Sequence, residues 1–445
     1  MTKRREFRPA TAVARVLVVV GVLSAWPGGA AAQNADDAKT LESRLAALEK
    51  GIQGTAVAGP KGFALKSTDG NFELKIRGYG QADGRFFFGD DDEKLTDTFL
   101  LRRIRPTLDG KVGEDWGFRI MPDFGGGKSE IVDAYIDFKP NAAFNIRGGK
   151  FKPPFGLERL QSGADLRLAE RAYPTSLAPN RDAGLQVAGE PWTGIHYALG
   201  VFNGVADGSS GDVDSEDGED FVGRLWLEPF KTAGIAALKG LSLGVAGSIG
   251  DVEGSSSSSG LSSYKSMGQA TIFSFRSSAT NAADTAFADG ARVRYSPQLT
   301  WYWGPFGLLG EYVQSSHEVR RGDHSATLDN EAWQAAASWV LTGEDNSFKR
   351  VKPKRPFAPS QGQWGAVELV GRFSALDFDG KAFPSYADPK KAVASVETVG
   401  AGVNWYLTDN IRASLDYEQS SFEGGASCGD QPDEQVLFAR WQVAF

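Results

Sequence analysis

Residues 72–86, FELKIRGYGQADGRF, alternate between two kinds of side chain over their whole length. One face carries Phe72, Leu74 and Ile76 followed by small residues, and the other carries a polar or charged residue at every position. An alternation of about 15 residues is longer than an ordinary globular strand, and it matches a tilted strand with lipid on one side and water on the other. This segment therefore predicts a strand that crosses a bilayer.

The same period of two recurs along the chain. Further examples lie at residues 116–124, 132–138, 292–301 and 411–418. Their polar faces carry too many charges for the packed core of a sandwich, so we expect these faces to line water. Short links also alternate with long Gly-, Ser- and Asp-rich loops, as in outer-membrane barrels. The short links are residues 112–115, 139–143, 190–194, 304–305 and 407–410.

Seventeen segments resemble strands, whereas a single-chain barrel of this kind has an even number. We assign residues 269–276 (QATIFSFR) to a long external loop, because the runs before and after them must point in opposite directions if residues 304–305 form a short turn. The sequence therefore predicts an all-β fold, a transmembrane antiparallel β-barrel of about 16 strands over residues 62–445.

The N-terminal residues indicate export. Basic residues precede the apolar run 16–23, and Ala30-Ala31-Ala32 resembles a cleavage site, so we expect residues 1–32 to be a cleaved signal peptide. Residues 33–61 should hold a short periplasmic helix, at 36–50, and a tether from residue 51. Three leucines share one face of that helix, which favours a coiled coil between partner chains; a frayed polar tail is the alternative. These features favour the bacterial outer membrane.

The last residues of the chain alternate as well and end on an aromatic side chain, Phe445. In outer-membrane proteins such an ending is read by the barrel-assembly machinery, so we expect Phe445 to contact that machinery. Tryptophans such as Trp116 and Trp303 lie beside the short links, where an aromatic girdle belongs. The expected surroundings of the barrel are outer-membrane lipid and lipopolysaccharide.

Composition argues against an enzyme, a metal site and a cofactor. Cys428 is the only cysteine, so neither an intrachain disulfide nor a thiolate cluster can form. His196 has no acidic or cysteine neighbour in its stretch of sequence, and His317 and His324 share a charged segment (HEVRRGDH) that favours solvated surface. The formal net charge of −8 disfavours nucleic acid as a partner.

A long loop separates two short strand patterns within residues 148–189, and loops of this length are usually functional. Five motifs in and beyond it resemble those of the phosphate-selective porin O/P family. They are GKFKPPFGLERLQS (149–162), ERAYPTSLAPNRDAGLQVAG (170–189), LGVFNG (199–204), RYSPQLTWYWGPFGLLGEY (294–312) and FKRVKPKRPF (348–357). The resemblance implies a homotrimer of sixteen-stranded barrels, each with its own pore narrowed by loop three.

An anion filter needs cations aimed into a narrow lumen, and the planar fork of Arg can donate two parallel hydrogen bonds to phosphate. Strict alternation would turn Arg103 and Arg105 inward and Arg102 outward, although a bulge near Pro106 could shift the register. The resemblance implies that Arg102 and Arg103 form the pair at the central phosphate site, with an arginine of the first strand, for which we choose Arg85.

An inward carboxylate would distinguish a protonated phosphate, which can donate a hydrogen bond, from anions that cannot. Asp133 is the candidate. Each of the candidate arginines above, and Asp133, could instead be an ordinary charged side chain that faces the water of a wide channel.

Residues 152–183 are expected to fold into the barrel as the constriction loop. Their cations are Lys152, Arg159, Arg167, Arg171 and Arg181. Since Glu158, Asp165, Glu170 and Asp182 nearly balance them, we expect some of these charges to bind the loop to the wall.

A basic periplasmic turn either collects anions at the exit or is merely solvated; its cations are Lys349, Arg350, Lys352, Lys354 and Arg355.

Two functions remain open for this fold. A passive channel for inorganic phosphate or other small anions is the first, and a general or cation-preferring porin for small solutes is the second. The second arises because the strand FVGRLWLEPF offers only Arg224 and the loop before it, DGSSGDVDSEDGED (207–220), is strongly acidic. An acidic mouth repels anions over a Debye length of about 8 Å. An outer-membrane enzyme or adhesin is poorly supported.

Overall fold

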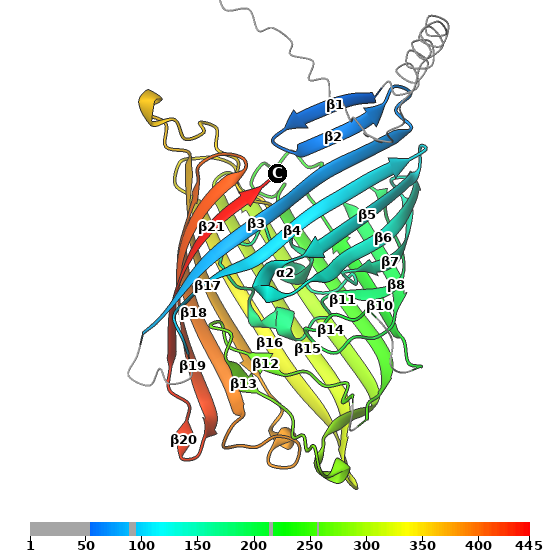
Figure 1. The fold of residues 1–445 in the computed structure, drawn as a ribbon, viewed down its shortest axis with the longest axis vertical. Helices are drawn as coiled ribbons and strands as arrows, with labels where there is room; N and C mark the ends of the chain where they lie inside the picture. The colour runs from blue at the N-terminus through cyan, green and yellow to red at the C-terminus, as the bar shows by residue number, and fades with distance from the viewer. Residues whose placement is uncertain (1–53, 89–94, 213–216, 256–257) are drawn as a thin grey trace, which may run out of the picture. The chain divides into compact units, whose positions relative to one another are not determined.

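A computed structural model describes residues 54–88, 95–212, 217–255 and 258–445 of the chain. The expected signal peptide and the helix at 36–50 lie outside these residues. Sixteen antiparallel strands form a closed barrel, which confirms the predicted fold class and strand number (Figure 1). The wall consists of β3 (Phe72–Phe88), β4 (Thr98–Val112), β5 (Trp116–Asp123), β6 (Glu130–Asn141), β7 (Phe144–Phe151), β8 (Asp182–Trp192), β9 (Ile195–Phe202), β10 (Asp220–Leu227), β11 (Leu241–Glu253), β14 (Phe287–Trp303), β15 (Phe306–Arg321), β16 (His324–Val340), β17 (Ala366–Asp377), β18 (Val393–Tyr406), β19 (Ile411–Ala426) and β21 (Glu434–Ala444).

The barrel closes where the last strand meets the first. β21 pairs with β3 in antiparallel register, with Trp441 opposite Ala82 and Arg440 opposite Asp83. The Arg440 guanidinium donates to both oxygens of Asp83 at 2.7 and 2.6 Å, and both side chains are almost fully buried. An ion pair between the two ends of the sequence therefore lies at the closing seam.

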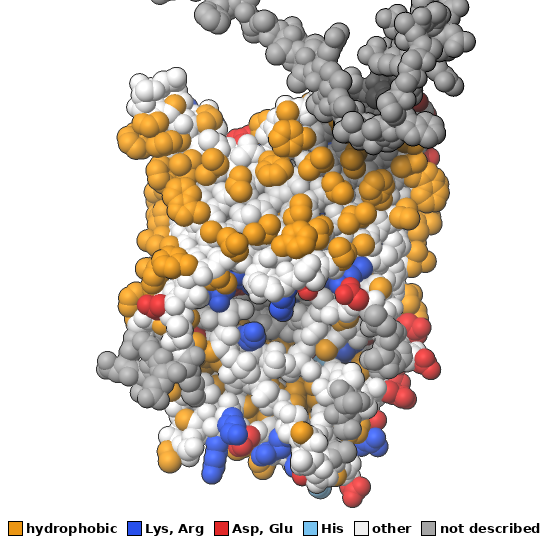
Figure 2. All heavy atoms as spheres, in the orientation of Figure 1, with side chains coloured by type: hydrophobic (Ala, Val, Ile, Leu, Met, Phe, Trp, Pro, Cys, Tyr) orange, Lys and Arg blue, Asp and Glu red, His pale blue; other side chains and the backbone are white. Residues whose placement is uncertain are grey.

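The two faces of each strand differ as the alternation predicts. In β18, Val399 and Val403 are 59% and 42% exposed on the outside, whereas Thr398 and Asn404 are 2% and 0% exposed on the inside. Figure 2 shows hydrophobic side chains gathered over the part of the barrel nearest to the end that carries β1 and β2, with charged side chains mostly beyond them. This apolar surface is the one that a lipid bilayer requires.

The connections follow the predicted arrangement of short and long links. Residues 304–305 join β14 to β15, and residues 407–410 join β18 to β19. Among the described residues no helix is long and apolar enough to span a membrane. Besides β1, β2, β12 and β13, which are described below, the short elements are α2 (Leu157–Leu160), η2 (Gly125–Gly127), η3 (Tyr173–Ser176), η4 (Ala282–Asp284), η5 (Pro359–Gln361), η6 (Gly380–Ala382) and β20 (Gly429–Asp430).

Residues 269–276 do not belong to the wall, as predicted. Within them, β13 (Thr271–Phe273) pairs only with β12 (Tyr264–Lys265), in a small separate sheet. Phe273 stacks on Phe378 with ring centroids 4.0 Å apart, and Tyr264 contacts both rings. This external loop is therefore held by aromatic packing to the connection that follows β17.

The tether expected from residue 51 to residue 61 is a wrong prediction for residues 54–59. These residues form β1 (Gly54–Gly59), which pairs with β2 (Gly62–Ser67), and β2 continues the sheet by pairing with β3. Two features explain the hairpin: Gly62 adopts a φ of +92° at the turn, and the ring of Phe63 packs against Phe445 at 6.1 Å. The sheet therefore begins eight residues before the predicted start at residue 62.

Candidate functional site

The long loop between β7 and β8 lies inside the barrel. Its backbone N–H at Ala169 donates to Asp416 of β19 at 2.7 Å, and the Tyr173 hydroxyl bonds Thr398 of β18 at 3.0 Å. Arg167 donates to Glu368 of β17 at 2.9 Å. Because β17 to β19 lie across the barrel from the strands that carry the loop, these contacts fix it within the lumen. We call residues 152–181 loop three, because β8 begins at Asp182 and the loop therefore ends two residues before the predicted boundary at residue 183.

A β-bulge decides where the arginines of β4 point. Gln81 of β3 lies opposite Arg103, but the next residue, Ala82, lies opposite Leu101, so Arg102 is the extra residue. Arg102 therefore does not follow the alternation that would turn it outward, and that expectation is wrong. The bulge also lies at Arg102 rather than at Pro106, which pairs regularly with Gly78.

Glu170 of loop three is the point where the predicted arginines converge. Arg102 donates to its two oxygens at 2.6 and 2.9 Å, Arg85 of β3 donates at 3.1 Å, and Arg103 lies 3.9 Å away. Burial would raise the pKa of the Glu170 carboxyl, but the charge and hydrogen bonds of Arg102, with Arg103 and Arg85, hold this pKa below its ordinary value. Glu170 is therefore ionised and binds loop three to both strands.

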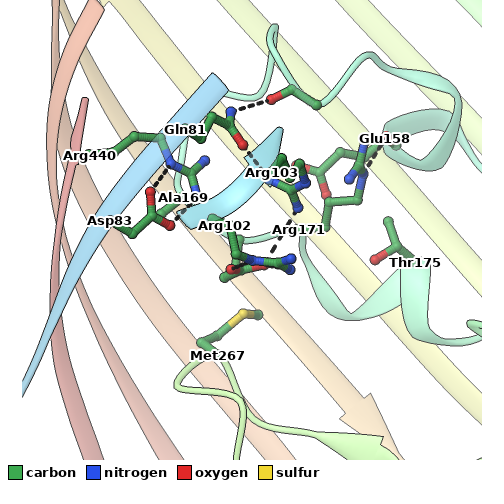
Figure 3. A network of polar contacts seen from close by, with 12 residues as sticks. Gln81, Asp83, Arg102, Arg103, Glu158, Ala169, Arg171, Thr175, Met267 and Arg440 are labelled. Atoms are coloured by element: carbon green, nitrogen blue, oxygen red, sulfur yellow. Dashed lines mark hydrogen bonds and ion pairs between the residues drawn. The ribbon is translucent and has the colours of Figure 1, made fainter. Parts of the chain in front are cut away.

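Arg103 and Arg105 have other partners besides. Arg103 donates to the Gln81 side chain at 2.9 Å, and Figure 3 shows it beside Arg102 and Arg171. Arg105 donates to Asp123 of β5 at 2.7 Å and to the Tyr79 hydroxyl at 2.9 Å. Both guanidinium groups are thereby oriented inside the barrel, as the alternation predicts.

Asp133 of β6 is buried but does not stand free in the lumen. It accepts a hydrogen bond from Arg181 of loop three at 3.0 Å, and Arg119 lies 3.9 Å away. In this arrangement it anchors the end of loop three. A role in recognising protonated phosphate stays a prediction.

A cavity of about 430 Å³ lies between β4, loop three and residues of two further loops, at 207–209 and 263–269. Arg102, Arg103 and Arg105 line it together with Arg159, Arg171 and Arg181, so six of the predicted arginines share one space. Its other charged lining residues are Lys128, Lys265, Asp123, Glu130, Glu170 and Asp207. Eight cations thus face four carboxylates, an excess of positive charge. Arg85, Asp133, Lys152 and Arg167 do not line this cavity.

Three cations of loop three have only neutral acceptors within the described structure. Arg159 donates to the carbonyl of Thr175, and Arg171 donates to the carbonyls of Glu158 and Gln161 at 3.2 and 2.7 Å. Lys152 donates to the same Gln161 carbonyl at 2.9 Å. Burial, followed by the charges of Arg171 and Arg181, lowers the pKa of Arg159 from its ordinary value. The cations therefore lie close enough to repel one another.

The basic turn between β16 and β17 also contacts loop three. The backbone N–H of Arg350 donates to Asp165 at 3.3 Å, and Gln161 donates to the carbonyl of Phe348 at 2.7 Å. Arg350 and Lys352 line a second cavity, of about 760 Å³, together with residues of the β1–β2 hairpin. Lys349, Lys352, Lys354 and Arg355 are exposed. Both readings of the turn, anion collection and simple solvation, remain open.

The sequence did not reveal a second buried network, which joins β14 to the acidic loop and shares Asp207 with the cavity. Arg294 of β14 donates to Asp207 at 2.7 Å and to Asp220 at 2.8 Å, and Arg292 donates to Asp220 at 3.0 Å. Asp207 and Asp220 are the two ends of the acidic loop, so arginines neutralise them. Lys150 pairs with Asp212 of the same loop. The acidic mouth is therefore less negative than its sequence indicates.

Two expectations about histidine are wrong. His317 is buried, not solvated: its Nε2 lies 3.0 Å from Asp207 and 2.8 Å from Ser315. His196 does have carboxylate neighbours, because β9 pairs with β8 and β10 and so brings Glu190 and Glu228 to it, the latter at 3.1 Å. These three residues could hold a metal ion, but Lys231 already places its ammonium group between the two carboxylates, at 3.2 and 2.5 Å.

Comparison with known proteins gives concordant matches. Residues 72–445 match the family model described as phosphate-selective porin O and P. Porin O of Pseudomonas aeruginosa is 24% identical over 420 residues, which cover 86% of this chain and 91% of that protein. Among solved structures, the outer-membrane channel DcaP of Acinetobacter baumannii aligns with a TM-score of 0.55 at 12% identity, over 85% of this chain and 99% of that one. OmpT of Vibrio cholerae aligns with a TM-score of 0.51 at 11% identity, over 84% of this chain and 98% of that one.

Proposed function

This chain belongs to the family of phosphate-selective porins O and P, and from that membership we propose that it is a passive channel for inorganic phosphate and other small anions. Its family and fold make it a porin of the bacterial outer membrane. Selectivity for anions is the further step that we propose. The observation that supports this step most strongly is the cavity in which six arginines outnumber the carboxylates.

The proposed mechanism relies on electrostatics and on a narrowed path. Loop three fills part of the lumen, so a solute must pass close to the guanidinium groups of β4 and of the loop. Several of their N–H donors face the cavity, and charge-assisted hydrogen bonds from Arg to phosphate are short and directional. Partial burial reduces the screening of these charges by salt. An anion is thus drawn to the constriction, while a cation meets a repulsive field.

The remaining expectations about surroundings and assembly are part of this proposal. We infer a homotrimer in lipid and lipopolysaccharide, export through a cleaved signal peptide at residues 1–32, and recognition of Phe445 by the barrel-assembly machinery. The support for the last inference is the terminal strand β21, whose outward residues Trp441 and Val443 are exposed and apolar. Phe445 also bonds the backbone of Gly78 in both directions at 3.0 Å.

A test of anion recognition compares the wild type with Arg103→Ala. Purified protein in a planar bilayer should pass a chloride current that phosphate blocks, and the variant should need about tenfold more phosphate for half block. The reason is the loss of one charge-assisted hydrogen bond, which contributes about 1.5–3 kcal/mol, where 1.4 kcal/mol corresponds to a factor of ten.

The matched control is Arg320→Ala, which removes an exposed arginine paired with Asp289 at 3.1 Å, away from the cavity. It should leave the block unchanged. A wild-type current that phosphate does not affect would reject the proposal.

A general or cation-preferring porin of the same fold is the second candidate. The observation in its favour is the acidic loop 207–220, of which Asp217 and Glu219 have no buried arginine partner among the described residues. This candidate predicts that cations carry most of the current.

A further inference from the structure

The cations that line the cavity differ in what already neutralises them. Arg102 is bound by both oxygens of Glu170, Arg105 by Asp123, and Arg181 by Asp133. Arg159 and Arg171 donate only to backbone carbonyls. Among these arginines, the positive charge without a carboxylate partner therefore lies on Arg159 and Arg171 rather than on Arg102.

Arg159 gives the strongest indication of an anion-binding site in the cavity. Its side chain is 8% exposed, and its Nε has no hydrogen-bond partner within the part of the chain that the structure describes. Arg has five N–H donors and stays protonated, so a buried guanidinium with so few acceptors is costly unless an anion completes its coordination. Arg171 lines the same cavity and has no ion pair among the described residues.

Glu170, also of loop three, lines the same cavity. It is 4% exposed and takes hydrogen bonds from Arg85 and Arg102, with Arg103 at 3.9 Å. The Glu170 carboxylate gives these three guanidinium groups the negative charge that a bound anion would give them. The cavity, at about 430 Å³, is many times the ~30 Å³ share of one water molecule, so a small anion fits beside Glu170 without displacing it.

We propose that Arg159 and Arg171 of loop three form the primary binding site of the anion, and that Glu170 is a built-in competitor that withholds Arg85 and Arg102 from it. This inference rests on the proposed function, because it requires that anions enter the cavity. Glu170 thereby sets the affinity: it keeps the site weak enough for an anion to leave, which conduction requires. Selectivity then depends on Arg159 and Arg171 more than on Arg102 of β4.

Glu170→Gln tests the competitor role. The amide keeps an oxygen for Arg102, and the backbone carbonyl of residue 170 still accepts from Arg372 at 2.9 Å, so loop three retains its main contacts. In planar bilayers we expect half block of the chloride current at about tenfold less phosphate than in the wild type, since one ionic competitor is removed. An unchanged or weaker block would overturn the proposal.

The matched control is Glu368→Gln. It removes one buried carboxylate from the same lumen, but Glu368 pairs with Arg167 and does not line the cavity. It should change phosphate block far less than Glu170→Gln. If both variants strengthened phosphate block equally, the cause would be the overall charge of the lumen, and the competitor role of Glu170 would be overturned.

The binding site is tested by Arg159→Gln with Arg171→Gln, compared with Arg102→Gln. The double variant should need at least about tenfold more phosphate for half block, and Arg102→Gln should change it much less. An Arg102→Gln effect as large as that of the double variant would overturn the proposal. Chloride conductance without phosphate checks that each variant is an open barrel. A wild type that phosphate does not block refutes the proposed function itself, whereas a blocked wild type with unresponsive variants refutes only this inference.

Discussion

Replacing residues 157–178 of loop three with a short Gly-Ser linker should raise the single-channel conductance severalfold and abolish block by phosphate. The segment holds α2, η3 and the buried side chains that cross the lumen, among them Leu166 and Leu177, both 0% exposed. Without it, Arg159, Arg171 and Glu170 are absent, and the path is bounded by the wall and by the loop that contains Lys265 and Gln269. Single-channel recording in potassium chloride, with and without phosphate, measures both effects.

The barrel itself should survive this replacement, because its sixteen strands are joined to one another and closed independently of the loop. Circular dichroism and heat-dependent migration of the refolded protein would verify this. An intact barrel whose conductance stays at the wild-type value would show that loop three does not narrow the path.

Breaking the ion pair at the closing seam should have the largest effect on stability. Asp83→Ala alone, or Arg440→Ala alone, leaves an uncompensated buried charge and should lower the free energy of unfolding by about 3–5 kcal/mol. The two side chains are 2% and 1% exposed and share two hydrogen bonds. Urea unfolding of the refolded protein in lipid measures the change.

A double-mutant cycle isolates the pair. Asp83→Ala with Arg440→Ala should cost much less than the sum of the single changes, since no charge is left unpaired. The exposed pair of Arg320 and Asp289, at 3.1 Å, serves as a control, and its loss should cost under about 1 kcal/mol. Single variants at the seam that behaved like this control would show that the seam is not held by its ion pair.

The fold could be predicted because its determinant is local. A period of two over fifteen residues, repeated along the chain, requires only that one face meet lipid and the other water, and the structure confirms the strand number and the short links. The hairpin at residues 54–67 was missed because its stability depends on pairing with β3 and on contact between Phe63 and Phe445, at the far end of the chain.

The candidate site was predictable in its residue types but not in its pairings. Arg102 turns inward because a bulge inserts it into β4, and the bulge depends on the register with β3 and on Glu170, 68 residues away. His196 gains its carboxylates only when three strands pair. The acidic loop is partly neutralised by Arg292 and Arg294, which lie more than seventy residues beyond its last residue. Long-range pairings of this kind leave no periodic pattern in the sequence.

The charge preference of the pore is the central claim, and a reversal potential tests it most directly. Purified wild-type protein is inserted into a planar bilayer that separates two concentrations of potassium chloride, and the voltage at zero current is recorded. Because guanidinium groups are in excess at the constriction, we expect the reversal potential to have the same sign as the Nernst potential of chloride, at neutral pH and moderate salt. A reversal potential with the sign of the potassium Nernst potential would contradict the account and would favour the cation-preferring porin.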